Sequence, residues 1–518
     1  MTADIWDVVI VGAGLSGLSA AHLLTKRDAK LRILILEGKD RVGGRTVSFE
    51  IPAADGADRW DFGGQWVGST QTHIMELIKE LGLEVYPQFN VGKKVLHVGG
   101  PTSKVRSYRT SIPALSPLVL LDFTQMLWKV RVKLCRTVSV QDPLRTPNAA
   151  ELDSMTVHSY IEQHAWTEEL KEQLGVCSRS VFGVEPSQMS FLFFLMYAAA
   201  AGGLLALLES SPGCAQEFKI KGGTQQLSEC LAQRVGWKNV RLGSAVTAIW
   251  QVDHENVEKL HKKHAFPFHL IVIQYQPALP SMREFLTQNM PVGHMMKFIL
   301  TYQTAFWKEK GFSGEIVAGS STDCPFCVTF DATSPRGNPA LVGFISGRQA
   351  TLWKRRAAVL SSLVKYLGPE AASCIHYEEK DWAKEEFSGG CPVSVMAPGL
   401  LTFYHPSLRK PCGRIHWAGT ETATLWCGYM SGAVQAGQRA ALEVLAEVSH
   451  VVLTPEEQES LIQGQTLHRP PKPTALSALL KRLSRKSVLI PALTIGAALL
   501  LVRKRDVLVK IQTYVGAF

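Results

Sequence analysis

The sequence lacks a secretory signal, a disulfide framework and a recognisable metal site. Its first residues contain no basic stretch followed by an apolar run, so no secretory signal is expected. The 10 cysteines are irregularly spaced, which indicates reduced thiols. Cys324 and Cys327 form a C-x-x-C pair without a second pair or a histidine cluster, so two ordinary buried thiols are expected and no metal is predicted.

Excess positive charge is also missing from most of the chain. The formal net charge is +10, but residues 465–518 carry ten Lys or Arg residues against one acid, Asp506. The rest of the sequence is therefore close to neutral, and no nucleic-acid partner is expected. The basic tail instead favours contact with an anionic surface.

No uncharged apolar run reaches the ~20 residues that usually span a bilayer. The best candidate is 487–502, sixteen residues between clusters of Lys and Arg, which as a helix would measure roughly 24 Å. A buried core helix is the alternative, but burying both basic clusters would be costly, whereas they can reach both interfaces of a membrane. We therefore predict a transmembrane anchor at 487–502, joined to the body by a linker at 451–486.

A glycine motif near the N-terminus is the most informative feature that is present. Gly12, Gly14 and Gly17 form G-x-G-x-x-G between an apolar stretch at 7–11, predicted to be a buried strand, and a predicted helix at 15–24. Such a turn can receive the pyrophosphate of a dinucleotide, because its glycines allow a tight turn, approach of backbone N–H groups and close helix packing. A glycine turn without a ligand is the alternative.

An acidic residue at the expected distance favours the functional interpretation. Glu37 ends a second predicted strand, 31–36, and stands twenty positions after Gly17. Its carboxylate can accept hydrogen bonds from a ribose 2′-OH, which favours an unphosphorylated dinucleotide over NADP. The strand, the helix and the acid together predict a dinucleotide-binding unit.

Changes of pattern along the chain predict two interleaved domains. Apolar periodicity predicts helices at 72–81, through 150–201 and at 430–447, whereas 91–140 is expected to form a hairpin and loops. Strands are expected at 31–36, 240–250, 298–302, 314–317, 340–346 and 414–417. We assign 4–90, 215–290 and 388–450 to a discontinuous dinucleotide-binding domain, and 91–214 and 291–387 to a substrate domain.

The sequence resembles the flavin-containing monoamine oxidases of the mitochondrial outer membrane. The resemblance rests on residues 9–17, on R-x-G-G-R at 41–45, on the segment 382–391 that ends in S-G-G-C, on 417–430 and on the basic-flanked tail. R-x-G-G-R is shared by many flavin amine oxidases, whereas S-G-G-C is far more selective. The implied fold is α/β, with a Rossmann-like FAD-binding domain interleaved with a mixed-sheet and helical substrate domain.

The resemblance also implies a set of site residues. FAD is expected to be attached through a thioether to Cys391, with Arg45 matching the pyrophosphate charge. Lys297 aligns with a lysine that holds a water near flavin N5, although a solvated strand lysine is the alternative for this residue alone. Tyr429 aligns with one of two tyrosines that enclose the amine, and Gln216 with a substrate-site glutamine. The expected FAD-binding residues are Gly12, Gly14, Gly17, Glu37, Arg45, Trp382, Cys391, Gly419, Thr420, Glu421 and Met430.

The implied reaction is oxidative deamination of primary arylalkyl amines to aldehydes, with O2 reduced to hydrogen peroxide. Secondary and tertiary amines are further candidate substrates. The resemblance implies a tail-anchored protein of the mitochondrial outer membrane, with its catalytic body facing the cytoplasm, and a homodimer as a candidate assembly.

Two departures from the family pattern keep other functions open. Pro392 stands where the family usually has the second tyrosine, and the segment 252–290 is shorter than expected. The first alternative is therefore a catalytically impaired FAD-binding homologue that acts as a membrane-attached binding or scaffold protein. A polyamine or amino-acid oxidase is disfavoured, because those enzymes generally lack both S-G-G-C and a membrane tail.

Overall fold

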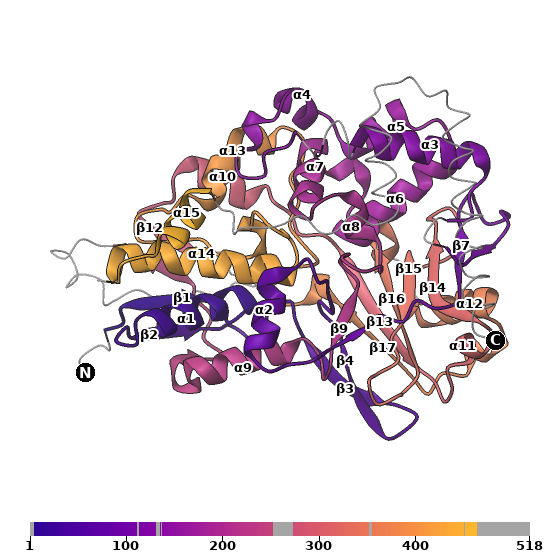
Figure 1. Ribbon diagram of the computed structural model, residues 1–518, viewed down its shortest axis with the longest axis horizontal. Coiled ribbons are helices and arrows are strands. Elements are labelled where there is room, and N and C mark those ends of the chain that lie inside the picture. The colour runs from indigo at the N-terminus through magenta and orange to yellow at the C-terminus, as the bar shows by residue number, and fades with distance from the viewer. Residues whose placement is uncertain are drawn as a thin grey trace, which may run out of the picture.

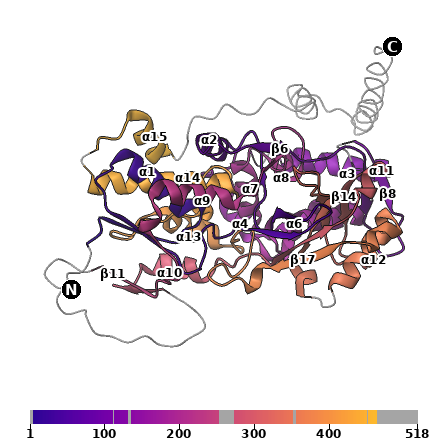
Figure 2. The ribbon, with the colours of Figure 1, turned by 90° about the horizontal axis from the view of Figure 1, so that it is seen from below.

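Both ends of the described chain meet in one unit of the structure, and the middle of the chain forms a second (Figures 1 and 2). The structure is a computed structural model. It describes residues 5–110, 113–130, 135, 137–251, 273–351, 355–449 and 451–463.

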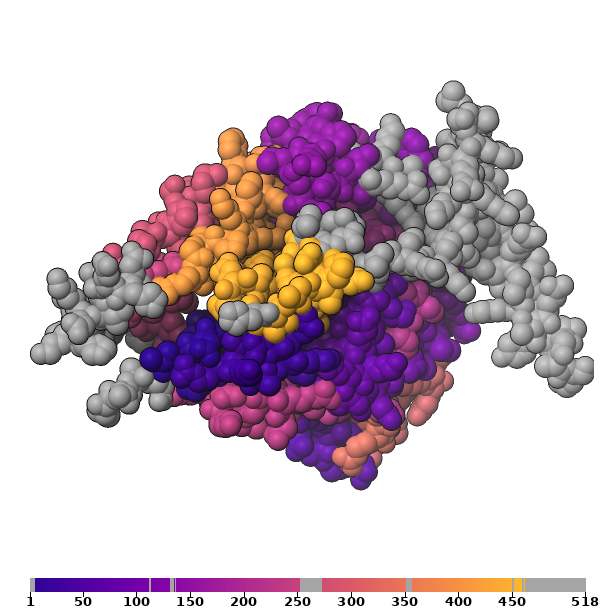
Figure 3. All heavy atoms as spheres, turned by 60° about the vertical axis from the view of Figure 1, so that its left-hand side comes forward, coloured from indigo at the N-terminus to yellow at the C-terminus, as the bar shows by residue number. Residues whose placement is uncertain are grey.

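The first unit is built on a parallel sheet of three strands, in the order β1-β2-β10. Its strands are β1 (Val8–Val11), β2 (Ile33–Leu36) and β10 (Val240–Arg241). Helices α1 (Leu15–Arg27), α9 (Gln225–Val235) and α14 (Met430–Val448) share a hydrophobic core with one face of this sheet. Figure 3 shows the last helices, in yellow, lying directly along the indigo N-terminal segment.

Two strand predictions need correction. The stretch 7–11 does form β1, but it is not fully buried, because Val9 is 50% and Val11 is 46% exposed. Alternate side chains of a strand point to opposite faces, and the described helices cover only one of them. The strand predicted at 414–417 is absent, since Gly413, at φ 60°, turns the chain so that Cys412 bridges to Ile415.

The second unit is a mixed sheet of seven strands, in the order β17-β13-β16-β15-β14-β7-β8. All its neighbouring strands pair antiparallel except β14 and β7, which are parallel. The strands predicted at 298–302, 314–317 and 340–346 correspond to β13, β14 and β16. The bounds are β7 (Lys93–His97), β8 (Arg106–Tyr108), β13 (Met295–Thr301), β14 (Phe312–Ala318), β15 (Val328–Asp331), β16 (Ala340–Ser346) and β17 (His376–Asp381).

A layer of helices that includes α3, α5, α6 and α7 lies above this sheet in Figure 1, and its core includes most of α7, whereas α11 and α12 share another core with the strands. The region 91–140 contains the expected hairpin, β7–β8, but also a helix that the sequence analysis missed, α3 (Pro117–Trp128). Its signal was local, because the Ser116 side chain caps the helix and Pro117 occupies its first turn. The other helices are α2 (Thr72–Glu80), α4 (Ala149–Ser154), α5 (Val157–His164), α6 (Glu168–Phe182), α7 (Phe191–Ala200), α8 (Leu204–Leu208), α10 (Ser281–Gln288), α11 (Phe306–Glu309), α12 (Arg355–Leu367), α13 (Leu400–Arg409) and α15 (Pro455–Gln463).

Three small sheets are also present. The sheet that contains β5 belongs to the first unit, because Val67 and Ile220 lie in the hydrophobic core of that unit. The strands of the three small sheets are β3 (Ser48–Pro52) with β4 (Ala57–Asp61), β5 (Trp66–Val67) with β9 (Phe218–Ile220) and β6 (Val85–Pro87), and β11 (Ala248–Trp250) with β12 (Gln274–Gln276).

The predicted membrane anchor cannot be placed on this fold. The anchor at 487–502, the linker beyond 463 and most of the shortened segment, 252–272, lie outside the described residues. In the part of the chain that the structure describes, no helix has the length and apolar character needed to cross a membrane.

Close backbone approach at Gly17 gives a test of the fold. A Cβ placed on Gly17 would lie 2.2 Å from the carbonyl oxygen of Gly12. We expect Gly17→Ala to lower the free energy of unfolding by about 1–3 kcal/mol, because the clash involves backbone that cannot move freely. Urea unfolding of the flavin-free protein measures this. Gly14→Ala is the matched control, since a Cβ there meets no atom within 4 Å, and a loss as large as that of Gly17→Ala would contradict the explanation.

Candidate active site

A single large cavity connects the two units. Its volume is about 1950 Å³, and its lining runs from the glycine turn after β1 to the sheet face that carries β13. Every site residue predicted from the sequence lines this cavity. They are Gly12, Gly14, Gly17, Glu37, Arg45, Gln216, Lys297, Trp382, Cys391, Gly419, Thr420, Glu421, Tyr429 and Met430.

The glycine turn has the room and the hydrogen-bonding groups that a dinucleotide needs. A Cβ on Gly12 or Gly14 would meet no protein atom within 4 Å, so the cavity opens directly over this turn. The buried Glu37 carboxylate accepts the backbone N–H groups of Ala13 at 2.7 Å and Lys39 at 3.0 Å. Each carboxylate oxygen keeps further acceptor capacity for a ribose hydroxyl. The residues present therefore fit the adenosine half of FAD.

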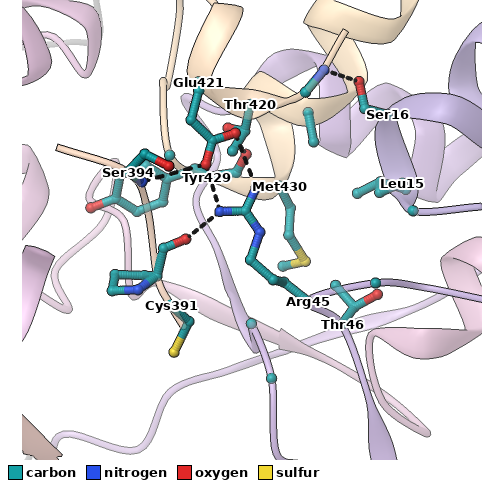
Figure 4. A pocket seen from close by; sticks show the side chains of 18 of the residues that line it. Leu15, Ser16, Arg45, Thr46, Cys391, Ser394, Thr420, Glu421, Tyr429 and Met430 are labelled. Carbon is teal, nitrogen blue, oxygen red and sulfur yellow. Dashed lines mark hydrogen bonds and ion pairs between the residues drawn. The ribbon is translucent and has the colours of Figure 1, made fainter. Parts of the chain in front are cut away.

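Arg45 joins three distant parts of the chain at the centre of the cavity (Figure 4). Its guanidinium forms two hydrogen bonds with the Glu421 carboxylate, at 2.7 and 3.0 Å, and donates to the Pro392 carbonyl at 2.8 Å. Burial opposes the charge of Glu421, but Arg45 outweighs it and lowers the pKa of this carboxyl. The guanidinium expected to meet a pyrophosphate is thus already paired with a protein carboxylate.

The helix predicted at 430–447 is confirmed, and a short 3-10 turn, η9, precedes it at Thr420–Thr422. The long helix α14 begins at Met430, and Tyr429 is its N-cap residue. The Tyr429 side chain therefore stands at the helix N-terminus, beside the Arg45–Glu421 pair (Figure 4).

Lys297 is buried in the middle of β13 and is only 2% exposed. Its amine donates to the Gly63 carbonyl at 3.0 Å and to Gln65 Oε1 at 2.5 Å. Burial lowers the pKa of Lys297 to about 7, although the nearby Asp61 carboxylate partly opposes this shift. The alternative of a solvated strand lysine is therefore wrong.

Cys391 and Trp382 lie at the edge of the same cavity. Burial raises the pKa of the Cys391 thiol to about 12, and its Sγ lies 3.7 Å from the Met295 carbonyl oxygen. Trp382 is 1% exposed and donates its indole N–H to the Phe62 carbonyl at 2.8 Å. Trp382 therefore contributes its ring, not its N–H, to the cavity wall.

Aromatic rings surround the part of the cavity near Tyr429. The Tyr429 ring centroid lies 6.0 Å from that of Tyr197 and 5.1 Å from that of Trp426. Burial raises the pKa of Tyr429, so its hydroxyl stays protonated at neutral pH. Gln216 donates from Nε2 to the Leu207 carbonyl at 2.9 Å, while its Oε1 has no hydrogen-bond partner among the described residues. Gln216 lines the cavity, but this oxygen is itself buried.

The sequence analysis missed two residues that the fold brings to this site. Gln65 contacts Lys297, and Tyr197 packs beside Tyr429. Gln65 follows the glycine pair after β4, and Tyr197 belongs to the apolar helix α7, so nothing in the local pattern marked either residue as functional. Only their positions in the cavity do so.

The fold and the cavity define a dinucleotide-dependent oxidoreductase. Residues 15–445 match the family model described as flavin containing amine oxidoreductase. The chain is 38% identical to flavin-containing amine oxidase A of Bos taurus, over 85% of each chain, and 35% identical to flavin-containing amine oxidase B of Canis lupus familiaris, over 98% of this chain and 99% of that one. The chain belongs to this amine oxidase family and is an enzyme of its flavin-containing monoamine oxidase group.

Solved structures agree with this assignment. Cyclohexylamine oxidase from Brevibacterium oxydans matches with a TM-score of 0.76 and 31% identity, covering 86% of this chain and 100% of that one. Putrescine oxidase bound to putrescine matches with a TM-score of 0.76 and 27% identity, over 85% and 99% of the two chains. The enzyme is thus an FAD-dependent amine oxidase with a mixed α/β fold.

The lowered pKa of Lys297 predicts how stability depends on pH. Its folded value is about 7, whereas an unfolded lysine titrates near ~10.4. Between these values the unfolded chain holds one more proton, so this group's contribution to folding stability rises with pH, by up to about 1.4 kcal/mol per unit. We expect wild-type protein to gain stability relative to Lys297→Met between pH 7.5 and 9.5 by roughly 2 kcal/mol. Urea unfolding at several pH values checks this, and a difference that does not change with pH would contradict it.

Proposed function

We propose that the enzyme oxidatively deaminates primary arylalkyl amines, and also secondary and tertiary ones, to aldehydes while it reduces O2 to hydrogen peroxide. The observation that carries this proposal is the aromatic cavity beside Lys297, which opens onto the same space as the glycine turn. FAD bound there would supply the two-electron oxidation of the amine. Glu37, Gly12 and Gly14 would hold its adenosine and pyrophosphate parts.

The cavity walls favour the reactive form of an amine. An amine is oxidised as the neutral base, and an apolar, desolvated pocket disfavours the ammonium form. Trp66 packs against Phe330 and Phe344 on the sheet side, with centroids 5.1 and 5.7 Å apart. Together with Tyr197 and Tyr429, these rings offer flat apolar surfaces that suit an aryl substituent.

Gln216 and Tyr429, which line the same cavity, are the side chains that we propose orient the amine. Gln216, which lines the cavity, is the amide that we assign to contact the substrate amine. Tyr429 presents one aromatic face, and Pro392 presents none at the second expected position. Each aromatic face contributes on the order of 0.5–2 kcal/mol to a nearby amine or ring. The loss of one face therefore predicts slower catalysis, not its absence.

The site residues also support a proposal for how the cofactor is kept. Cys391 lies in the cavity wall between the Arg45–Glu421 pair and β13, where a thioether to the flavin would fix the ring beside Lys297.

We further propose a C-terminal membrane anchor at 487–502, a mitochondrial outer-membrane location with the body facing the cytoplasm, and a homodimer. The basic-flanked tail and the likeness to flavin-containing amine oxidases A and B support these proposals.

Anaerobic mixing with a panel of amines tests the proposed reaction. We expect bound flavin to be bleached by arylalkyl amines, with aldehyde and hydrogen peroxide formed when O2 is admitted. Flavin that binds fully but is bleached by no amine would favour the second candidate, an impaired binding or scaffold protein, for which Pro392 is the motivating observation. Bleaching by putrescine or amino acids alone would contradict the arylalkyl preference.

Acid precipitation tests the proposed attachment through Cys391. We expect wild-type protein to keep its yellow colour in the pellet and Cys391→Ala to release its flavin into the supernatant, because the thioether sulfur is gone. Cys427→Ala is the matched control, since this cysteine is buried and does not line the cavity. A Cys391→Ala pellet that stays yellow would refute the attachment site.

A further inference from the structure

Phe387 is a large aromatic residue that the proposed reaction has so far left without a role. It is 47% exposed and lines the cavity together with Lys39 and Ser388. A single apolar ring on an outer surface needs no explanation, but rings that border a cavity commonly serve as ligand contacts. The backbone and the neighbours of Phe387 decide between these two interpretations.

The backbone at Phe387 adopts a conformation that a phenylalanine rarely takes. Its φ is 60°, in the left-handed region that disfavours residues with a Cβ. Such strain persists only where the surrounding structure imposes it, and it is concentrated at ligand-binding and catalytic sites. A glycine would adopt this conformation without strain, so a phenylalanine in its place points to a use for the ring.

Two polar contacts hold the turn that carries Phe387 against the loop after β2. Glu385 pairs with Lys39 and with Arg41, each at 2.7 Å. Ser388 accepts a hydrogen bond from the Lys39 amine at 3.3 Å. Because residues on both sides of Phe387 are tied to the same loop, the backbone that carries the ring is fixed beside it.

The ring lies directly on Gly38, the residue that follows Glu37. A Cβ on Gly38 would stand 2.8 Å from Cε2 and Cζ of Phe387 and 3.1 Å from Cδ2, so only glycine allows this approach. The contact involves these three ring atoms and leaves part of the ring to the cavity. Glu37 is the carboxylate expected to bind the adenosine ribose, and the adenine base is bonded to that ribose. The ring thus stands next to the residue that would hold the sugar of the base.

We propose that Phe387 binds the adenine base of FAD by packing its aromatic ring against the base. Every nucleobase has a flat π-face, so an aromatic side chain beside it contributes affinity without any hydrogen bond. This inference rests on the proposed binding of FAD in the cavity. It assigns a contact to the end of the cofactor that takes no part in the oxidation of the amine.

Ligands that carry or lack the base test this contact in the full-length protein. Cys391→Ala serves as the background, because it removes the proposed covalent bond and keeps flavin binding reversible. We expect Phe387→Leu to raise the Kd for FAD and for ADP by about fivefold or more, because stacking on the base is lost. The Kd for FMN, which lacks the base, should not change. Calorimetric titration of the flavin-free protein measures all three.

Three further variants serve as controls. Phe387→Tyr keeps the ring and should keep the Kd for FAD and ADP of the background protein. Phe403→Ala should also leave them unchanged, because Phe403 is 69% exposed and does not line the cavity. If Phe387→Leu fails to fold, Phe387→Gly gives the same comparison, since it removes the ring and relieves the left-handed strain.

The outcomes distinguish this inference from the function on which it rests. Background protein that binds neither FAD nor FMN would overturn the proposed function. Binding of FAD and ADP that is as tight in Phe387→Leu as in the background protein would overturn the contact with the base alone. A Kd that rises equally for FAD and FMN would show that the ring supports the cavity as a whole, which also overturns the proposal.

Discussion

The close backbone approach between α1 and α14 of the first unit is the constraint on which the site depends. A Cβ on Gly437 of α14 would lie 2.1 Å from the Ser16 carbonyl oxygen of α1, so only glycine allows this contact. The contact places Gly419 against Ser16, whose side chain accepts the Gly419 N–H at 2.9 Å. The loop that carries Glu421 and Tyr429 is thereby brought over the glycine turn, and the two chain ends enclose one cavity.

Within that cavity, burial determines what each polar group can do. Arg45 and Glu421 keep their charges because they face each other, whereas Lys297 donates only to neutral acceptors and Asp61 offsets its burial only in part, so the pKa of Lys297 falls to about 7. Desolvation thus produces a lysine that can change its protonation near neutral pH from a residue that would otherwise stay charged. Gln216 Oε1 and Gln65 Nε2 are both buried without a hydrogen-bond partner among the described residues.

The local features of the fold were largely predictable, because they depend on neighbours in the sequence. Helices α1, α2 and α14 and strands β13, β14 and β16 follow the periods of their apolar residues. The prediction at 414–417 was wrong because one glycine turn overrides an alternating polar and apolar stretch, and α3 was missed although its Ser-Pro start was visible. The pairing of Arg45 with Glu421, 376 residues apart, has no local signal at all.

The sequence by itself determined the class of the cofactor and of the chemistry, because the glycine motif, Glu37 and the segment that ends at Cys391 are short, contiguous patterns whose spacing reflects local geometry. Only the tertiary structure decided which residues act on one another: that Lys297 is buried against Gln65, and that Tyr197 stands beside Tyr429. These contacts join segments from different elements. Their energies come from desolvation and packing, which exist only once the whole cavity has formed.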